Sequence, residues 1–297
     1  MIYGGKLYNL FRVFNTIIML LILIVTLYPF WYVFIISVSN PLAVMGGKVG
    51  LVPVRFEMVS YQLILETPRF WSGYANTVKY TVVGVLLSLS LTIACAYPLS
   101  KKRLKLRKAV MIFIVFTMFF DGGLIPLYLL VRKLGLIDTL WAITLPVAIA
   151  PWNMIVMRVF LERVPESLED SAKIDGANDW QILRSIYFPL SKPIIATIGL
   201  FYAVAHWNSW FSALIFLNDP RLQPVSLFLR SLVLGAEVAI KLGLREFDDL
   251  QRQVDFTPQT LRTAAIILVV APIVLIYPFI QKYFVKGMLI GSLKGGN

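Results

Sequence analysis

The sequence predicts an all-α membrane protein with six transmembrane helices, and three observations carry this expectation. Of the 297 residues, 58% are hydrophobic and only 15% are charged, whereas soluble domains average about 25% charged residues. Six apolar stretches each provide the roughly 20 residues that a helix needs to cross a bilayer. A run of basic residues between two of these stretches then sets their orientation.

The six expected spans differ in how continuous their apolar sequence is. The first is too long for the apolar region of a cleaved signal peptide, and no small-residue cleavage site follows it, so it is expected to remain as an anchor. Gly and Pro interrupt the third and fourth, which membrane helices tolerate where neighbours satisfy the backbone. The spans are residues 13–36, 75–100, 109–131, 140–161, 190–217 and 263–283.

The basic loop between the second and third spans indicates the orientation. Residues 101–108 contain six Lys or Arg and no acid. Short basic loops stay in the cytoplasm, so this loop and, with six spans, both termini are expected to be cytoplasmic. The net charge of +12 is explained by topology rather than by nucleic acid. One cysteine, Cys95, and one histidine, His206, exclude an internal disulfide and a His or Cys metal cluster.

Residues 162–189, between the fourth and fifth spans, form a loop longer than a connection requires. Pro165 suits a helix start, and Gly176 suits the left-handed position that follows a helix. Asn178, with a glutamine three residues later, is typical of a capping box that begins a second helix, which Pro189 ends or redirects. The loop is therefore expected to fold as helix, tight glycine turn and helix.

The charge of this loop favours a protein partner. It has six acids against three bases, and the small residues around Gly176 leave the turn unobstructed. An amphipathic pair lying on the membrane is the alternative, but interfacial helices are usually rich in Lys and Arg on their polar face. We therefore expect another protein's surface to approach this turn closely.

The spacing within this loop carries a family resemblance. It reads Asp170-Ser171-Ala172-x-x-x-Gly176, nine residues, and Ile186-x-Phe188-Pro189. It resembles the EAA loop of ABC importer permeases, Glu-Ala-Ala-x-x-x-Gly, nine residues, Ile-x-Leu-Pro, with Asp for Glu, Ser for Ala and Phe for Leu. Residues 174–182 and 281–287 are similar to the carbohydrate-type subfamily, and residues 121–131 to permeases for oligosaccharides released from complex polysaccharides.

The resemblance implies a type I ABC importer permease fold of the MetI-like kind, in the cytoplasmic (inner) membrane of a bacterium. It divides the chain into an N-terminal anchor span with the first outer loop (1–72), a five-span permease core (73–284) and a cytoplasmic tail (285–297). The core would contain the coupling loop at 162–189 and an outer loop at 218–262. The mixed charges of the outer loop suit docking of a solute-binding protein, and a solvated lid is the alternative.

The resemblance also implies partners: a second permease subunit, two ATPase subunits, an extracytoplasmic solute-binding protein and membrane lipid, with no nucleic acid. The sequence has no G-x-x-x-x-G-K-[ST] phosphate loop. The chain is therefore expected to be no enzyme and to bind no cofactor, while the partner ATPase uses ATP and Mg. The residues implied in coupling to the ATPase are Glu169, Asp170, Ser171, Ala172, Asp175, Gly176, Ala177, Ile186 and Pro189.

A polar and aromatic run in the fifth span suggests the substrate pathway. Polar groups in a membrane usually face the bundle interior or a water-filled cavity, and Trp faces beside amides and hydroxyls suit a sugar. Helix packing and interfacial anchoring are the alternatives for these residues. His206 alone suits a hydrogen-bonded structural role, and Asp121 a cap on a helix break. The candidates are His206, Trp207, Asn208, Trp210, Asn153 and Asp121.

The resemblance implies import of a carbohydrate, and an oligosaccharide more than a monosaccharide. The basic surplus would suit uronate-type fragments such as those of alginate or pectin, although topology explains most of it. Alternatives are an ABC permease for a non-sugar solute and an ion-coupled secondary transporter, which would need ionisable sites near mid-membrane. A membrane enzyme lacks a catalytic constellation here, and a purely structural subunit leaves the acidic loop unexplained.

Overall fold

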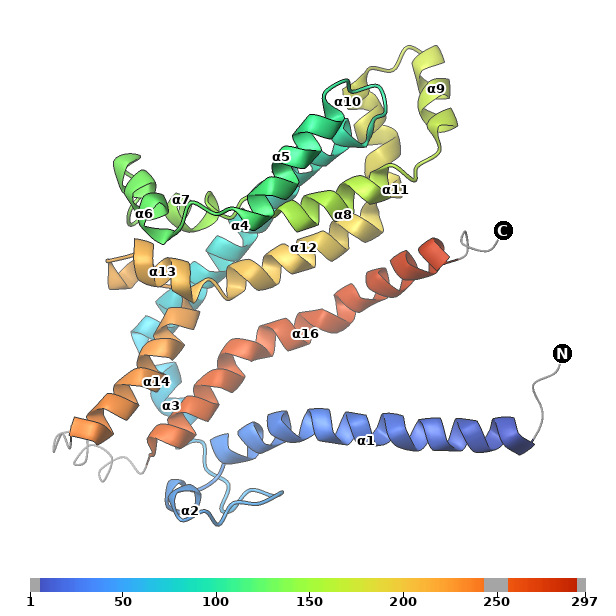
Figure 1. Ribbon diagram of the computed structural model, residues 1–297. Helices are drawn as coiled ribbons and strands as arrows, with labels where there is room; N and C mark the ends of the chain where they lie inside the picture. Colours follow the sequence, from blue (N-terminus) through green and yellow to red (C-terminus); the bar gives the residue numbers. More distant parts are fainter. Residues whose placement is uncertain (1–5, 243–255, 293–297) are drawn as a thin grey trace. The chain divides into compact units, whose positions relative to one another are not determined.

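The computed structural model describes residues 6–242 and 256–292, and every regular element within those ranges is a helix (Figure 1). The chain divides into two compact units. One comprises residues 1–68 and 229–271, and the other comprises residues 69–228 and 272–297. Part of the fold prediction is thereby confirmed, since the described chain is all-α.

The first unit contains α1 (Lys6–Ser37), α2 (Pro41–Met45), α3 (Val59–Glu66), most of α14 (Val225–Leu242) and the first part of α16 (Pro258–Ser292). The α1 helix is apolar and exposed over most of its described length. The side chain of Asn40 caps α2 by accepting a hydrogen bond from the Ala43 amide. The buried hydroxyls of Ser60 and Thr260 are 3.0 Å apart and join α3 to α16.

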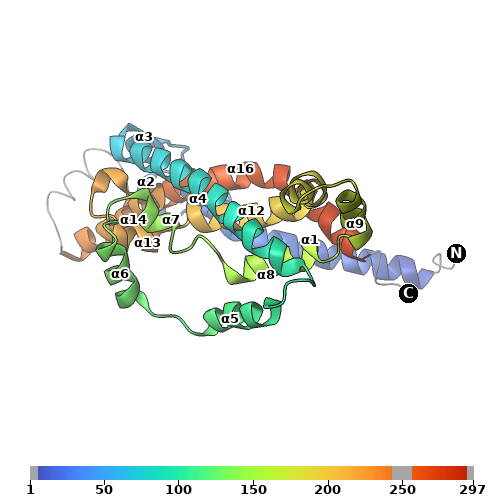
Figure 2. The ribbon, with the colours of Figure 1, turned by 90° about the horizontal axis from the view of Figure 1, so that it is seen from above.

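The second unit positions the functional sites. Within it α5 packs on α8, and α8 packs on α12 (Figure 2). Its helices are α4 (Pro68–Ser100), α5 (Arg107–Phe119), α6 (Leu124–Lys133), α7 (Leu140–Thr144), α8 (Pro151–Leu161), α9 (Glu166–Ile174), α10 (Asp179–Ile182), a π-helix (Leu183–Tyr187), α11 (Phe188–Leu190), α12 (Lys192–Trp207), α13 (Trp210–Phe216) and a 3₁₀ turn (Pro220–Leu222).

A stripe of small residues on α4 allows a close approach of α12 at Gly84. Gly84, Ser88, Thr92 and Ala96 recur at every fourth position, so they share one face, and all four are buried. A Cβ atom on Gly84 would lie 2.6 Å from the ring of His206 on α12. Small residues allow such close approach between membrane helices, and here they hold α12 directly against α4.

Three of the expected spans correspond to single helices. Tyr8–Ser37, Pro68–Ser100 and Pro258–Ile276 are long and apolar enough to cross a membrane. Two bent helix pairs raise the number of candidate spans in the described chain to five. The six-span topology and the cytoplasmic termini stay predictions, and residues 293–297 of the expected tail lie outside the described residues.

The third expected span, residues 109–131, is interrupted near Gly122 and Gly123, where the sequence pattern is broken. The chain bends by 111° between α5 and α6. Gly123 adopts φ +83°, a left-handed conformation that glycine reaches without steric cost. The carboxylate of Asp121 accepts a hydrogen bond from the Gly123 amide at 3.2 Å and so caps the break.

The fourth and fifth expected spans are also interrupted. Between α7 and α8 the chain leaves the helix around Pro146, and α8 resumes at Pro151, because proline lacks the amide that a helix interior needs. The region 190–217 contains two helices, α12 and α13, separated at Asn208 and Ser209. The interruption at Pro146 was expected from the sequence, whereas a continuous helix over 190–217 was a wrong prediction.

Candidate functional site

The segment from residue 165 to residue 182, here called the elbow, contains α9, the Gly176 turn and α10. Figure 1 shows α9 on the outside of the second unit, beyond α10 and α11. The expected helix, glycine turn and helix are confirmed. Acidic side chains in the first turn of α9 suit the positive end of the helix dipole.

Gly176 ends α9 with a Schellman motif. Its φ is +81°, which an L residue reaches at a cost of about 1–2 kcal/mol. The Gly176 amide donates to the Lys173 carbonyl at 3.0 Å, and the Ala177 amide donates to the Ala172 carbonyl at 2.9 Å. These two bonds satisfy the last carbonyls of the helix and fix the angle at which the chain leaves α9.

A capping box then starts α10. The Asn178 side chain accepts from the Gln181 amide at 2.9 Å, and the Gln181 side chain accepts from the Asn178 amide at 2.8 Å. The π-helix follows, and Pro189 lies within α11. The helical direction changes by 82° between Leu190 and Lys192, so the redirection expected at Pro189 takes place just after it.

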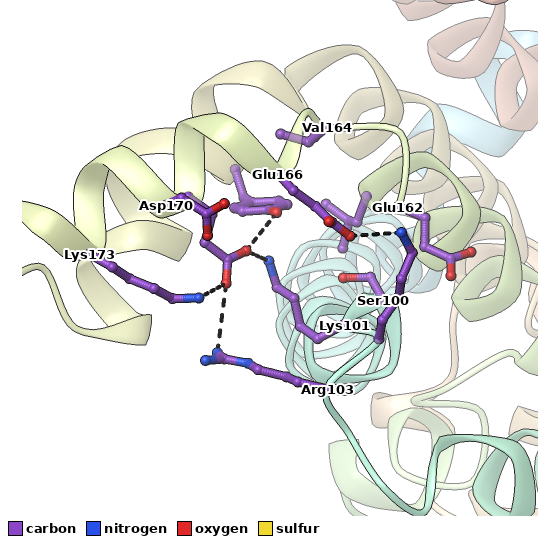
Figure 3. Close-up of a pocket in the computed structure, with 12 residues that line it drawn as sticks. Ser100, Lys101, Arg103, Glu162, Val164, Glu166, Asp170 and Lys173 are labelled. Atoms are coloured by element: carbon purple, nitrogen blue, oxygen red, sulfur yellow. Dashed lines mark hydrogen bonds and ion pairs between the residues drawn. The ribbon is translucent and has the colours of Figure 1, made fainter.

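A buried carboxylate attaches the elbow to the end of α4. Glu169 of α9 is 5% exposed and forms an ion pair with Lys101. The Tyr187 hydroxyl donates at 3.0 Å to the Oε2 atom that pairs with Lys101, and Lys173 Nζ lies 2.6 Å from the other oxygen, Oε1. Figure 3 shows Lys101, Lys173 and Arg103 converging on this carboxylate, with Arg103 at 3.9 Å.

The protonation state of Glu169 follows from these contacts. Burial alone would raise its pKa, but hydrogen bonds from Lys101, Lys173 and Tyr187 outweigh burial and lower the pKa to about 2. Burial, together with the hydrogen bond to Glu169, raises the pKa of the Tyr187 hydroxyl. The Lys101 ammonium also lies 3.6 Å from the centroid of the Tyr187 ring, a cation–π contact. Glu169 is therefore ionised throughout the physiological pH range, so protonation does not weaken the attachment there.

The predicted coupling residues of the elbow, and of the π-helix and α11 that follow it, divide into an inward-facing and an exposed set. Ala172, Ala177 and Ile186 pack against the core that contains Ile182 and Tyr187, and Glu169 faces inward. Asp170, Ser171, Asp175, Gly176 and Pro189 are exposed. The inward set holds the elbow, and the outward set is available to another molecule.

Two large apolar side chains of the elbow are also exposed. Ile174 at the end of α9 is 86% exposed, and Trp180 on α10 is 69% exposed. Exposed apolar groups beside polar ones are typical of protein interaction sites. The elbow thus combines acids with two apolar projections on a turn fixed by backbone hydrogen bonds.

A second site is a cavity of about 280 Å³ between α8, α12 and α13. It brings together three of the six predicted pathway residues, Asn153, His206 and Asn208. Tyr202, Ser209 and Ser212 add further polar groups to a largely apolar lining. Such a combination is typical of small-molecule sites, where a few polar groups fix orientation.

His206 is held by the stripe on α4. Its Nε2 lies 3.3 Å from the Ser88 hydroxyl, and one turn away the Tyr202 hydroxyl lies 2.7 Å from that of Thr92. The Tyr202 oxygen also accepts from the Ala150 amide at 3.1 Å, where α8 begins. Neutral hydrogen bonds therefore join α4, α12 and α8 around the cavity.

The other three pathway candidates do not line this cavity. Trp207 meets Tyr74 edge to face at 5.7 Å and lines a separate apolar groove that includes Pro272. Trp210 packs edge to face with Phe211. Asp121 caps the break between α5 and α6, as described above.

Comparison with known proteins decides the family. Residues 84–290 match the family described as "Binding-protein-dependent transport system inner membrane component". The chain belongs to this family. It is a transport permease, a component that works with a separate binding protein, and not an enzyme. Within residues 6–242 and 256–292, no group of three or more His, Cys, Asp or Glu could hold a metal ion.

Individual relatives resemble the permease over most of their length. It is 39% identical over 290 residues to the polygalacturonan/rhamnogalacturonan transport system permease protein YtcP of Bacillus subtilis, covering 96% of this chain and 99% of that one. It is 39% identical over 271 residues to Protein LplC of the same organism, covering 91% and 90%. A crystal structure of a bacterial ABC transporter involved in the import of the acidic polysaccharide alginate includes a chain that is 35% identical, with TM-score 0.85 and 96% and 100% coverage.

Sequence reasoning missed several residues of both sites. Lys101 belongs to the basic loop, where orientation explained its charge, so its ion pair with a residue 68 positions away had no local signal. Ile174 is an apolar side chain in a polar helix, a signal that could have been used. The spacing of Gly84 and Ser88 on α4, continued at Thr92, was likewise visible as a small residue at every fourth position.

Proposed function

We propose that this permease forms one half of the membrane pathway of an ABC importer for acidic oligosaccharides and is driven through its elbow by a separate ATPase. A second permease subunit, two ATPase subunits that use ATP and Mg, and an extracytoplasmic solute-binding protein complete the importer. The chain crosses the bacterial inner membrane six times, with both ends and the elbow in the cytoplasm. The basic loop at 101–108, beside the elbow, supports that orientation.

The structure of the elbow is the observation that carries the coupling role. A coupling segment must be held rigidly by the permease that it moves, and it must be accessible to the ATPase that drives it. The buried ion pair of Glu169 and Lys101 supports the first requirement, and the exposed Ile174 and Trp180 support the second. Movement of an ATPase against α9 would pass through this ion pair to the end of α4.

The relatives support an acidic sugar as cargo. YtcP is named for polygalacturonan and rhamnogalacturonan, and the crystallised relative belongs to an importer of alginate, an acidic polysaccharide. Both kinds of polymer contain uronic acids. The two relatives match this chain over nearly its whole length, which favours a related substrate here.

We assign the pathway to the cavity between α8, α12 and α13. Amide and hydroxyl groups of Asn153, Asn208 and Ser212 line it, and they can exchange hydrogen bonds with sugar hydroxyls. The lining includes no Lys, Arg, Asp or Glu, so a carboxylate is not bound tightly on its way through. Asn153→Leu should therefore slow transport of every sugar that the importer accepts, whereas Thr117→Val on the exposed face of α5 is the matched control.

The test is sugar-stimulated ATP hydrolysis by the complete importer in proteoliposomes, with its binding protein. We expect stimulation by oligogalacturonate or alginate oligosaccharides and little by neutral oligosaccharides of equal length. Equal stimulation by neutral glycans would contradict the acidic-sugar assignment, and stimulation only by a non-sugar solute would contradict carbohydrate import. Uptake driven by an ion gradient without ATP would identify a secondary transporter instead.

A further inference from the structure

A cavity where α4 turns into α5 is lined by cations and contains no acid. Its volume is about 550 Å³, within the range of about 300–1,000 Å³ that is typical of ligand pockets. Six of its eight lining residues are basic, and the other two are apolar. They are Lys102, Arg103, Lys105, Arg107, Lys108, Arg158, Leu104 and Met111. We call it the basic cavity.

The neighbouring carboxylates do not balance this charge. Arg107 and Arg158 share one oxygen of Glu162. Lys102 and Arg103 pair with exposed acids of the elbow. Among the described residues, Lys105 and Lys108 form no ion pair. The basic cavity therefore keeps a positive excess that would attract an anion.

The helix that leaves the basic cavity is apolar and exposed. No residue of α5 is buried, and large side chains such as Ile112, Phe113 and Phe116 are exposed. This apolar surface begins within one turn of Lys108. Cations at the end of a lipid-facing helix lie at the level of phospholipid headgroups.

We infer that the basic cavity binds the phosphate of an anionic phospholipid, such as phosphatidylglycerol, whose acyl chains lie along α5. Guanidinium groups match phosphate oxygens bidentately, and Arg107 and Arg158 lie deeper in the protein than the lysines. A phospholipid accounts for both the charge of the basic cavity and the apolar surface beside it, which a soluble anion would not. The inference goes beyond import and rests only on α5 lying in the membrane.

The test is equilibrium binding of phosphatidylglycerol, fluorescently labelled on an acyl chain, to the whole importer in detergent. Lys105→Gln/Lys108→Gln removes the two cations without ion pairs. Arg132→Gln/Lys133→Gln, at the end of α6, removes the same charge outside the basic cavity. Because each cation near an anionic headgroup strengthens its binding and salt screens part of the attraction, we expect the first variant to bind about tenfold more weakly. The control variant and the wild type should bind equally.

Competition identifies the ligand. Unlabelled phosphatidylglycerol should displace the label, while phosphatidylcholine should not. Equal weakening in both double variants would show non-specific attraction and overturn the site. Displacement by millimolar inorganic phosphate or by a uronate trimer would overturn the lipid assignment in favour of a soluble anion. Binding that appears only after the ATPase subunits are removed would identify this surface as a protein interface instead.

Discussion

The elbow and the cavity between α8, α12 and α13 both contain buried polar groups, but these groups have different kinds of partner in the two places. In the elbow a full negative charge, Glu169, is paired with Lys101. Around the cavity the buried partners are neutral, as in the pairs of His206 with Ser88 and Tyr202 with Thr92. A charge pair costs more to separate than a neutral hydrogen bond. The attachment of the elbow is therefore expected to resist separation more than the contacts around the cavity, as the proposed coupling role of the elbow requires.

The largest effect is expected at the turn of the elbow. Gly176→Pro fixes φ near −65° where the turn needs +81°, and it removes the amide that donates to the Lys173 carbonyl. Sugar uptake should fall at least tenfold while ATP hydrolysis loses its dependence on the sugar. Parallel uptake and ATPase assays measure this uncoupling.

Smaller changes at the same position sharpen the result. No atom lies within 4 Å of a Cβ added to Gly176, so Gly176→Ala suffers only from the left-handed backbone. Gly176→Asn should be milder still, because Asn tolerates that conformation. Normal coupling in the Pro variant would show that the elbow does not transmit force.

The second prediction tests the buried charge. Glu169→Gln leaves Lys101 buried without its counter-charge, and breaking such a pair costs about 3–5 kcal/mol. Backbone amides of α9 should exchange hydrogen roughly a hundredfold faster, which corresponds to the lower end of that range. Replacing both partners, in Glu169→Leu/Lys101→Met, should restore most of the protection. Equally fast exchange in the double variant would contradict the role of the pair.

The acid dependence of α9 follows from the same group. The pKa of Glu169 is lowered from 4.5 to about 2 in the folded protein, because its cationic and hydroxyl partners outweigh its burial. Its stabilising contribution is therefore complete above about pH 4.5 and is lost as the pH falls towards 2. Hydrogen exchange of α9, corrected for its intrinsic rate, should not vary from pH 8 to pH 5. A loss of protection between pH 7 and pH 5 would contradict this assignment.

The third prediction tests the close packing of α4 against His206 beside the cavity. Gly84→Ala places a Cβ 2.6 Å from the His206 ring, and such overpacking costs about 1–3 kcal/mol. Thermal stability and transport should both fall. Gly199→Ala is the matched control, since its Cβ would meet only the end of the Leu89 side chain at 3.3 Å. Rescue of Gly84→Ala by His206→Ala would show that the clash is the cause.

The smallest effect is expected at the start of α10. Asn178→Ala removes the capping box and should cost about 1 kcal/mol. Asn178→Ser keeps an acceptor and should cost less. Hydrogen exchange of the α10 amides measures both, and an Ala variant as protected as the wild type would mean that packing alone holds this helix.

The elbow was largely predictable because its signals are local. Gly176 and Asn178 act on residues within one turn of themselves, so the sequence pattern predicted the turn and the second helix. The contacts of Glu169 with Lys101 could not be predicted, since the two are brought together only by packing. Only part of the cavity lining was predicted. A single run of sequence suggested His206 and Asn208, but the positions of Tyr202 and of the partners on α4 depend on tertiary structure.

The helix breaks likewise divide into those with a local sequence signal and those that depend on tertiary packing. Gly122, Gly123 and Pro146 marked the interruptions near them, because glycine and proline change backbone geometry directly. The bend at Ser191 follows the redirection expected at Pro189, but the break at Asn208 contains neither residue type and was not predicted. There the packing of successive helices decides where the chain turns.

Photo-crosslinking from the elbow tests the central claim most directly. A photoreactive amino acid replaces Ile174 or, as an inward-facing control, Ala172, in the assembled importer. The account predicts an adduct between position 174 and the ATPase subunit, and none from position 172. Adducts from position 174 with lipid or with the solute-binding protein, and none with the ATPase, would contradict it.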